Sequence, residues 1–283
     1  MVISVSDLHF SYGKRSILEN LNFEIAENEV VALLGPNGVG KTTLLDIILG
    51  QLNPQNGSVS VLGKTPRYQD AKFWMEIGIV QQHWRDHPKW PVKDHLEWAR
   101  SLYQAAGKKP KTVAEALAEV DASEHINQPL AKLSGGLRRR IDFATATLGN
   151  PKLLILDEPS TGLDVEARHN IHQLIDQATL NGATVLFTTH DLDEAEKVAS
   201  RIMILNSKQI LADDTPSHLR TKHTPLAQIS WKDSAGNTQV HATNEVEKFV
   251  AQLPLTQISE LTITRPTLET AYLDLMSKGE KDD

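Results

Sequence analysis

Alternating apolar and polar residues open the chain, and short, fully apolar runs follow at intervals. The alternation has the period of two that is typical of strands with one buried face, and it covers residues 2–10 and 21–25. The apolar runs are typical of parallel strands that are buried on both faces. Together the two patterns predict strands at residues 2–10, 21–25, 30–34, 57–62, 77–80, 152–159, 184–188 and 202–205.

Apolar residues at helical spacing occupy most segments between these strands. Thr112 and Glu115 have the spacing of a capping box and predict the start of one helix. Further helices are predicted at residues 43–49, at 137–148, after Asp164 and after His190. Strands that alternate with helices are typical of an α/β fold. Residues from about 84 to 148 interrupt the alternation and predict a helical subdomain.

The pattern changes after Pro216. It predicts a hairpin from residues 228–231 and 238–241, a helix at 245–253, a strand at 258–264 and a helix at 268–276. Residues 216–283 are therefore predicted to form a small α+β appendage without a catalytic signature, following a larger domain of residues 1–215.

Composition and charge narrow the classes of partner. The chain has 283 residues, of which 40% are hydrophobic and 23% charged, as in an ordinary soluble globular protein. No apolar run approaches the ~18 residues needed to span a bilayer, the N-terminus does not have the pattern of a signal peptide, and the lack of cysteine excludes disulfides and suits the cytoplasm. A net charge of −7 argues against nucleic acid and against direct adhesion to anionic lipid. If the protein works at a membrane, a partner protein is expected to attach it there.

The segment GPNGVGKTT, residues 35–43, matches the phosphate-loop pattern G-x-x-x-x-G-K-[ST] through Gly35, Gly40, Lys41 and Thr42. It lies between a predicted buried strand and a predicted helix, which disfavours the alternative of a glycine-rich turn that binds nothing. Glycines allow backbone N–H groups to surround phosphate oxygens, and the helix N-terminus adds partial positive charge. Lys41 is predicted to reach the β- and γ-phosphates, and the hydroxyl of Thr42 to ligate Mg²⁺.

Other polar residues lie where ligands bind in such folds. Asp157 and Glu158 follow an apolar strand, so they are predicted at the carboxyl edge of the sheet, although an acidic turn is the alternative. Ser134, Gly135 and Gly136 open a predicted helix and form a second candidate anion site. Tyr12, Asp164 and His190 remain open from the residues alone: Tyr12 is a loop aromatic or a base platform, Asp164 can be only an N-cap, and His190 can be a surface histidine.

Three clusters have structural interpretations that are favoured over functional ones. Arg138 to Arg140 face different sides of a helix, so a solvated or salt-bridged role is predicted in place of a nucleic-acid contact. His83 and His87 are four residues apart, but Pro88 and the lack of nearby carboxylates disfavour a metal site. The tryptophans of this region, Trp84, Trp90 and Trp98, are predicted to pack within the subdomain.

Over about the first 215 residues, the chain resembles an ABC-transporter ATPase subunit. The resemblance lies in the order and spacing of the phosphate loop, the LSGG stretch, LLILDEP, STGLD and His190. The resemblance implies a P-loop NTPase with an ABC-type mixed sheet core, an antiparallel β subdomain and a helical subdomain that carries the signature. It also implies ATP and Mg²⁺ as cofactors. The implied loop contacts to ATP are Gly35, Pro36, Asn37, Gly38, Val39, Gly40, Lys41, Thr42 and Thr43.

The resemblance assigns a role to each remaining candidate. Tyr12 stacks on the base, Asp157 holds Mg²⁺ through water, and Glu158 is the general base. Gln82, with Gln81 as the adjacent alternative, senses Mg²⁺ and the γ-phosphate, and His190 contacts the γ-phosphate. Ser134, Gly135 and Gly136 complete the ATP site of the opposite protomer, and Asp164 lies in the loop that crosses the dimer interface.

One position departs from the usual LSGGQ signature, because Leu137 stands in fifth place. The chain is similar to the ATPase subunits of drug-resistance-type and polysaccharide-type exporters in three features. These are LSGG without that glutamine, the basic run after it, and residues 265–276. The implied partners are a separate polytopic membrane permease, facing residues 84–98, and a second ATPase subunit in a homodimer or heterodimer. The implied location is the cytoplasmic face of the membrane. The alternatives are an importer subunit and a soluble ATPase that acts on ribosomes or nucleic acid.

Overall fold

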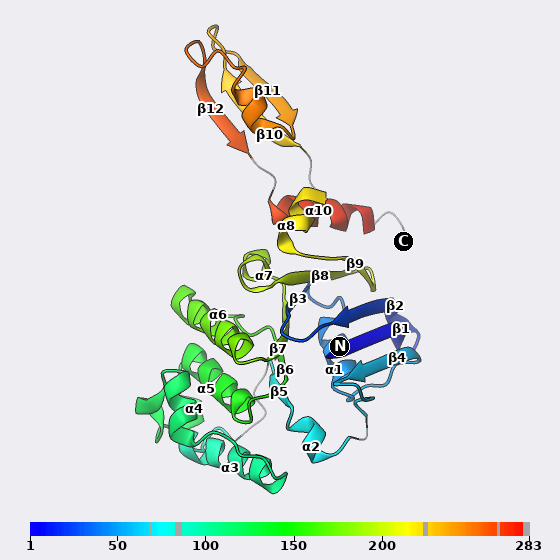
Figure 1. Cartoon of the computed structure of the whole chain (residues 1–283), viewed down its shortest axis with the longest axis vertical. Coiled ribbons are helices and arrows are strands. Elements are labelled where there is room, and N and C mark those ends of the chain that lie inside the picture. The colour runs from blue at the N-terminus through cyan, green and yellow to red at the C-terminus, as the bar shows by residue number, and fades with distance from the viewer. Residues whose placement is uncertain (68, 83–86, 223–225, 265–266, 280–283) are drawn as a thin grey trace. The chain divides into compact units, whose positions relative to one another are not determined.

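The computed structural model describes residues 1–67, 69–82, 87–222, 226–264 and 267–279. The chain divides into two compact units, Met1–Asp213 and Asp214–Asp283 (Figure 1). No helix of the described ranges is long and apolar enough to cross a membrane.

A six-stranded sheet with the order β5-β6-β7-β3-β8-β9 forms the centre of the first unit. Pairing is parallel from β5 through β8. Ser207 and Lys208, both with positive φ, form the two-residue turn of a hairpin between β8 and β9, so β9 runs antiparallel and the sheet is mixed, as predicted. The strands are β5 (Ile77–Val80), β6 (Leu153–Asp157), β7 (Thr184–Thr189), β3 (Val30–Leu34), β8 (Arg201–Asn206) and β9 (Gln209–Asp214).

The edge strand β9 was not predicted from the sequence. Its residues are half-buried or exposed, and it ends on two aspartates. An edge strand with little burial lacks the apolar run that identifies the inner strands, because only one of its edges is paired.

An antiparallel sheet with the order β2-β1-β4 forms a second layer. Its strands are β1 (Ile3–Tyr12), β2 (Arg15–Ile25) and β4 (Asn56–Val61). The predicted link at residues 11–16 is wrong: the ladder continues to the pair Tyr12–Arg15, and only two residues form the turn. Register shifts along β1 break the period of two, which hid this extension in the sequence pattern.

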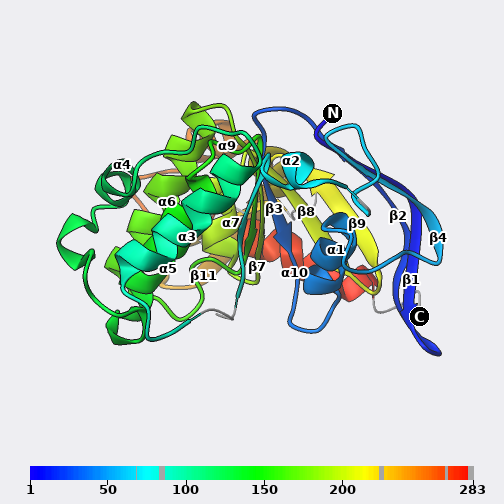
Figure 2. The same cartoon turned by 90° about the horizontal axis from the view of Figure 1, so that it is seen from below.

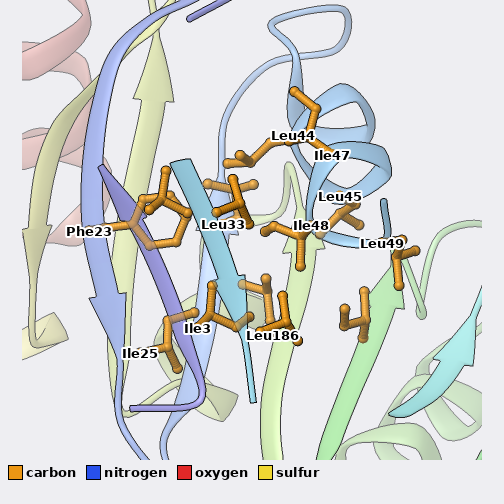
Figure 3. Close-up of a cluster of buried hydrophobic side chains, with 14 of the residues drawn as sticks. Ile3, Phe23, Ile25, Leu33, Leu44, Leu45, Ile47, Ile48, Leu49 and Leu186 are labelled. Carbon is orange, nitrogen blue, oxygen red and sulfur yellow. The ribbon is translucent and has the colours of Figure 1, made fainter. Parts of the chain in front are cut away.

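Helix α1 (Lys41–Ile48) lies between the two sheets, whereas the helices α3 to α6 cover the other face of the central sheet (Figure 2). The main core forms where α1 meets both sheets (Figure 3). Leu44 and Ile48 of α1, Leu33 of β3 and Ile3 of β1 are fully buried there. Burying each such side chain contributes roughly 1.5–3 kcal/mol, so the phosphate loop that precedes α1 is held by a rigid frame.

The helical part contains α3 (Val92–Ala105), α4 (Val113–Glu119), two 3₁₀ turns (Ser123–His125 and Leu130–Lys132) and α5 (Gly135–Thr147). The predicted capping box of Thr112 and Glu115 is confirmed. Ser134 caps α5 by accepting a hydrogen bond from the N–H of Leu137 at 3.3 Å. The remaining helices of this unit are α2 (Ala71–Trp74), α6 (Val165–Leu180) and α7 (Leu192–Val198).

The arginine run of α5 is salt-bridged, as predicted, but not solvated. Arg138 and Arg139 are 5% and 4% exposed, and both pair with Asp142. Burial lowers the pKa of Arg139, and the opposing charge of Asp142 offsets part of that effect. Arg140 donates to the carbonyl of Val120 at 2.9 Å. Packing of α5 against its neighbours, which no local pattern reveals, accounts for the difference.

The tryptophan prediction holds only in part. Trp90 is half-buried and stacks on His87, but Trp98 is 51% exposed, because it lies on the outer face of α3. Trp84 and His83 lie outside the described residues. Within the ranges that the structure describes, no three metal-ligating side chains gather.

The second unit contains an antiparallel sheet of order β11-β10-β12. The predicted hairpin forms β10 and β11, and the predicted later strand is β12, which pairs with β10. Ala227, Ile229 and Val246 form its small core. Helix α8 before the sheet was not predicted, since its seven residues are too few for a clear helical period. The elements are α8 (Pro216–Lys222), β10 (Ala227–Lys232), β11 (Thr238–Thr243), α9 (Val246–Val250), β12 (Ser259–Thr264) and α10 (Leu268–Gly279).

Candidate functional site

The loop between β3 and α1 follows a path that side chains would block. A Cβ on Gly35 would lie 2.4 Å from the carbonyl oxygen of Leu205. Gly40 has φ 117°, where only glycine is unstrained, and it is the residue that caps α1. The loop therefore passes close to β8, and the unpaired N–H groups at the start of α1 lie together at its end.

Lys41 is the first residue of α1 and only 5% exposed. Its Nζ donates to the carbonyls of Gly35 at 2.7 Å and Pro36 at 3.2 Å, and it lies 3.5 Å from Oε1 of Glu158. A buried ammonium at the mouth of an amide-rich loop is suited to neutralise a phosphate.

Asp157 ends β6 and contacts two hydroxyls. Its Oδ2 accepts from Thr42 Oγ1 at 3.2 Å, and its Oδ1 accepts from Thr188 Oγ1 at 2.6 Å. A cavity of about 280 Å³ adjoins this pair and is also lined by Gln82 and Asp46. A carboxylate and a hydroxyl are hard oxygen donors, and a magnesium ion keeps several of its waters. The residues and the space beside them fit such an ion.

Glu158 is the centre of the site. It is 7% exposed; its Oε2 accepts from Gln82 Nε2 at 3.2 Å and from Thr161 Oγ1 at 3.0 Å, while its Oε1 lies 3.5 Å from His190 Nδ1. Burial raises the pKa of this carboxyl, but the Thr161 hydroxyl, the charge of Lys41 and His190 outweigh burial, and the net pKa lies below its usual range. Glu158 is therefore ionised at neutral pH and can accept a proton.

The structure distinguishes the two neighbouring glutamines. The side chain of Gln82 contacts Glu158, whereas Gln81 is exposed and contributes its carbonyl, which accepts from Arg139 Nη1 at 2.6 Å. The buried Arg139 thus supports the backbone from which Gln82 projects.

His190 follows β7 in a turn that is held on both sides. The N–H of Asp191 donates to Thr189 Oγ1 at 3.0 Å, and Asp191 caps α7. The second carboxylate oxygen of Asp191 accepts from Arg168 of α6 at 3.0 Å. The imidazole remains 44% exposed beside Glu158, so it is accessible to a ligand.

Tyr12 ends β1 with 52% of its surface exposed and one edge against Phe10, whose ring centroid is 4.9 Å away. The side-chain amide of Gln55 continues the ladder where β4 stops: it accepts from the N–H of Ser11 at 2.6 Å and donates to its carbonyl at 2.8 Å. The ring is therefore held on a paired strand and presents an open face.

The signature residues do not join this cluster within one chain. Ser134 caps its own helix, and a Cβ on Gly136 would lie 2.7 Å from Cβ of Ala167 in α6. Asp164 caps α6 by accepting from the N–H of Ala167 at 2.8 Å. Among the described residues, no hydrogen bond or ion pair connects these three residues to Lys41 or Glu158.

Several contacts of the site involve residues that sequence reasoning missed. Thr188, Thr161, Arg139 and Gln55 each hold a candidate residue in place. Only Thr188 had an available signal, because parallel pairing of the predicted strands 152–159 and 184–188 sets it opposite Asp157. The others depend on contacts between distant segments.

Known proteins resemble this chain in sequence. A family model described as "ABC transporter" matches residues 18–161. The Nod factor export ATP-binding protein I of Rhizobium johnstonii is 32% identical over 98% of this chain and 96% of its own length. The linearmycin resistance ATP-binding protein LnrL of Bacillus subtilis is 32% identical over 77% of this chain and 70% of its own.

Solved structures agree in fold. The structure of an ATP-binding subunit of an ABC transporter has a TM-score of 0.69 and 26% identity, and the match covers 78% of this chain and 93% of the other. A nucleotide-free ATP-binding cassette from an ABC transporter has a TM-score of 0.68 at 20% identity, over 78% of this chain and 94% of the other.

Proposed function

Because this chain belongs to the ABC transporter family, we propose that it is the subunit that hydrolyses ATP to drive export through a separate membrane permease. One observation carries the proposal: Lys41, Gln82 and His190, from three distant segments, all approach the carboxylate of Glu158. Hydrolysis of a phosphoanhydride requires charge neutralisation and an oriented water, and these groups can supply both.

The residues divide this work by position. The backbone N–H groups of the loop at residues 35–43, other than Pro36, and the ammonium of Lys41 bind the phosphates, and His190 contacts the terminal one. Thr42 and Asp157 would hold Mg²⁺, with Gln82 beside it, and the bound ion would supply positive charge to neutralise the charge developing on the phosphates. Glu158 is ionised, buried and next to Asp157, so it orients the attacking water and accepts its proton.

A second ATPase subunit, identical or similar, completes each site in this proposal. Ser134, Gly135 and Gly136 form the N-terminus of α5, and in the described part of the chain no hydrogen bond connects them to their own phosphate loop, so in this proposal they serve the opposite protomer. Leu137 is 8% exposed and packs inward. The position that usually holds glutamine is therefore used for packing, while the serine and glycines remain available.

A permease is expected to dock on the surface formed by three aromatic residues, His87, Trp90 and Trp98, together with Leu102. Trp98 and Leu102 are 51% and 42% exposed on α3, and Trp90 lies between His87 and Trp98. Both curated relatives above carry export or resistance in their names, which favours export over import. The subunit then lies at the cytoplasmic face of the membrane, held by its partner, with no role for nucleic acid.

The chain's two units receive different assignments. All residues named for hydrolysis lie in the unit Met1–Asp213, which we assign as the ATPase domain, with its helical subdomain from about residue 84 to 148. The unit Asp214–Asp283 is the C-terminal appendage; the sequence-based boundary at residue 216 lies two residues beyond the division in the structure.

A pull-down of the tagged chain from detergent-solubilised native membranes tests the transport role. A polytopic membrane protein at matching stoichiometry is the expected result, and its sequence would help to separate export from import. Recovery of ribosomal proteins or nucleic acid, without a membrane partner, would overturn the transport role and favour the soluble alternative.

Tyr12→Ala is expected to weaken ATP binding roughly 5- to 150-fold, because stacking of a base on an aromatic ring contributes ~1–3 kcal/mol. Binding of inorganic tripolyphosphate, which has no base, should not change. Both affinities can be measured by competition against a fluorescent nucleotide. Tyr12→Phe keeps the ring and should bind ATP normally; equal weakening of ATP and tripolyphosphate in Tyr12→Ala would argue against base stacking.

A further inference from the structure

Thr188 is a fully buried residue of β7, in register with Asp157 on the adjacent strand. Its hydroxyl makes two hydrogen bonds. It donates to Oδ1 of Asp157 at 2.6 Å, and it accepts from the N–H of Glu158 at 2.9 Å. One hydroxyl therefore contacts both consecutive acids at the end of β6.

The first bond sets the rotation of the Asp157 carboxylate. With Oδ1 turned toward Thr188, Oδ2 faces Thr42, 3.2 Å away, and the adjoining cavity. A hydroxyl has a single proton to donate. Since that proton is used on Asp157, the carboxylate is kept in the orientation that brings the two candidate magnesium ligands together.

The second bond holds an unusual backbone. Glu158 has φ 47°, in the left-handed region that side chains other than glycine, asparagine and aspartate rarely adopt. Such conformations persist where the surroundings over-determine them. Thr188 accepts the N–H of this residue, and the turn directs the Glu158 side chain toward Lys41 and Gln82.

We propose that Thr188 is a positioning residue that sets the relative orientation of the metal-holding Asp157 and the general base Glu158 through a single hydroxyl. The proposal rests on the roles given to these acids above. Thr188 is fully buried and acts through its two neighbours. A side chain of the same shape is therefore not sufficient at position 188; a hydroxyl is required.

Thr188→Val tests this directly, since valine has nearly the same shape and no hydroxyl. It leaves the buried N–H of Glu158 and one oxygen of Asp157 without a partner, so turnover is expected to fall roughly 10- to 100-fold. Nucleotide affinity in EDTA should remain at the wild-type value, while the gain in affinity on adding Mg²⁺, measured with a fluorescent nucleotide, should shrink. Thr188→Ser restores the hydroxyl and should recover most of both properties.

Thr147→Val is the matched control, because Thr147 is also buried and its hydroxyl donates to the carbonyl of Phe143 within α5 at 2.9 Å. It should leave the magnesium dependence unchanged.

Wild-type turnover and magnesium dependence in Thr188→Val would overturn the proposal, as would equal losses in the serine and valine variants. If the valine variant does not unfold cooperatively, Thr188→Ala replaces it. Failure of Glu158→Gln to reduce turnover would instead overturn the general-base role.

Discussion

Glu158→Gln is expected to bind ATP with nearly wild-type affinity and to lose roughly 10²- to 10⁴-fold of its turnover, the usual contribution of a general base. Glutamine has the same shape and can still accept from Thr161, which contacts Oε2 at 3.0 Å. It cannot take a proton from water. The measurement is phosphate release at saturating ATP, together with nucleotide binding to the same preparation.

The same variant should also accumulate as an ATP-bound dimer, because in the proposed assembly the signature of each chain completes the site of the other and hydrolysis releases the pair. Sedimentation with and without ATP measures this. Glu119→Gln is a suitable control, since Glu119 is an exposed partner of Lys111, and such pairs contribute only about 0–1 kcal/mol. Normal hydrolysis by Glu158→Gln would remove its general-base role; monomers at saturating ATP would count against the shared site.

Lys41→Ala is expected to weaken nucleotide binding roughly 10- to 150-fold, and turnover at low ATP with it, because hydrogen bonds to charged groups contribute about 1.5–3 kcal/mol. The ammonium is 5% exposed and lies within the loop, so water cannot replace it fully. A fluorescent nucleotide titration measures the loss.

Lys208→Ala provides the control for Lys41, since it removes an exposed ammonium that pairs with Glu19 at 3.0 Å outside the site. Lys41→Arg should not restore binding, because the planar guanidinium does not fit a position shaped for a compact ammonium. Affinity within twofold of wild type in Lys41→Ala would contradict the assignment of the loop as the phosphate site.

These two variants separate binding from chemistry. Lys41 and Glu158 are only 3.5 Å apart, yet one is expected to govern affinity and the other turnover. The separation follows from their chemistry: a cation stabilises bound phosphate in the ground state, whereas a proton acceptor acts only when water attacks.

The elements near the site were predictable from sequence wherever the signal is local. The loop at residues 35–43 lies between β3 and α1, the capping box of Thr112 and Glu115 is present, and Ser134 and Asp164 cap α5 and α6. Each of these depends on residues within a few positions of one another, so spacing along the chain contains the information. The inner strands of the central sheet were predictable from their apolar runs, whereas its mixed character followed only from the family resemblance.

Predictions that depended on exposure were less reliable. Arg138 and Arg139 are salt-bridged, one of the two predicted roles, but they are buried and not solvated. Trp98 is exposed although packing was expected. The outer ends of β1 and β2 were missed because register shifts interrupt the period of two. The edge strand β9 was missed for a reason related to exposure. Edge strands complete a hydrogen-bond ladder with little burial, so their side chains show no apolar pattern.

By itself, the sequence determined the family and the order of the main elements and indicated the groups that are proposed to act, because a phosphate loop, a signature and strand-end acids are patterns of neighbouring residues. Only the tertiary structure decided which groups meet. It brought Gln82 and not Gln81 to Glu158, placed Arg139 beneath them, and set Thr188 against both acids. These contacts join residues 30 to 76 positions apart along the chain, and they depend on strand register and helix packing, which no short stretch of sequence specifies.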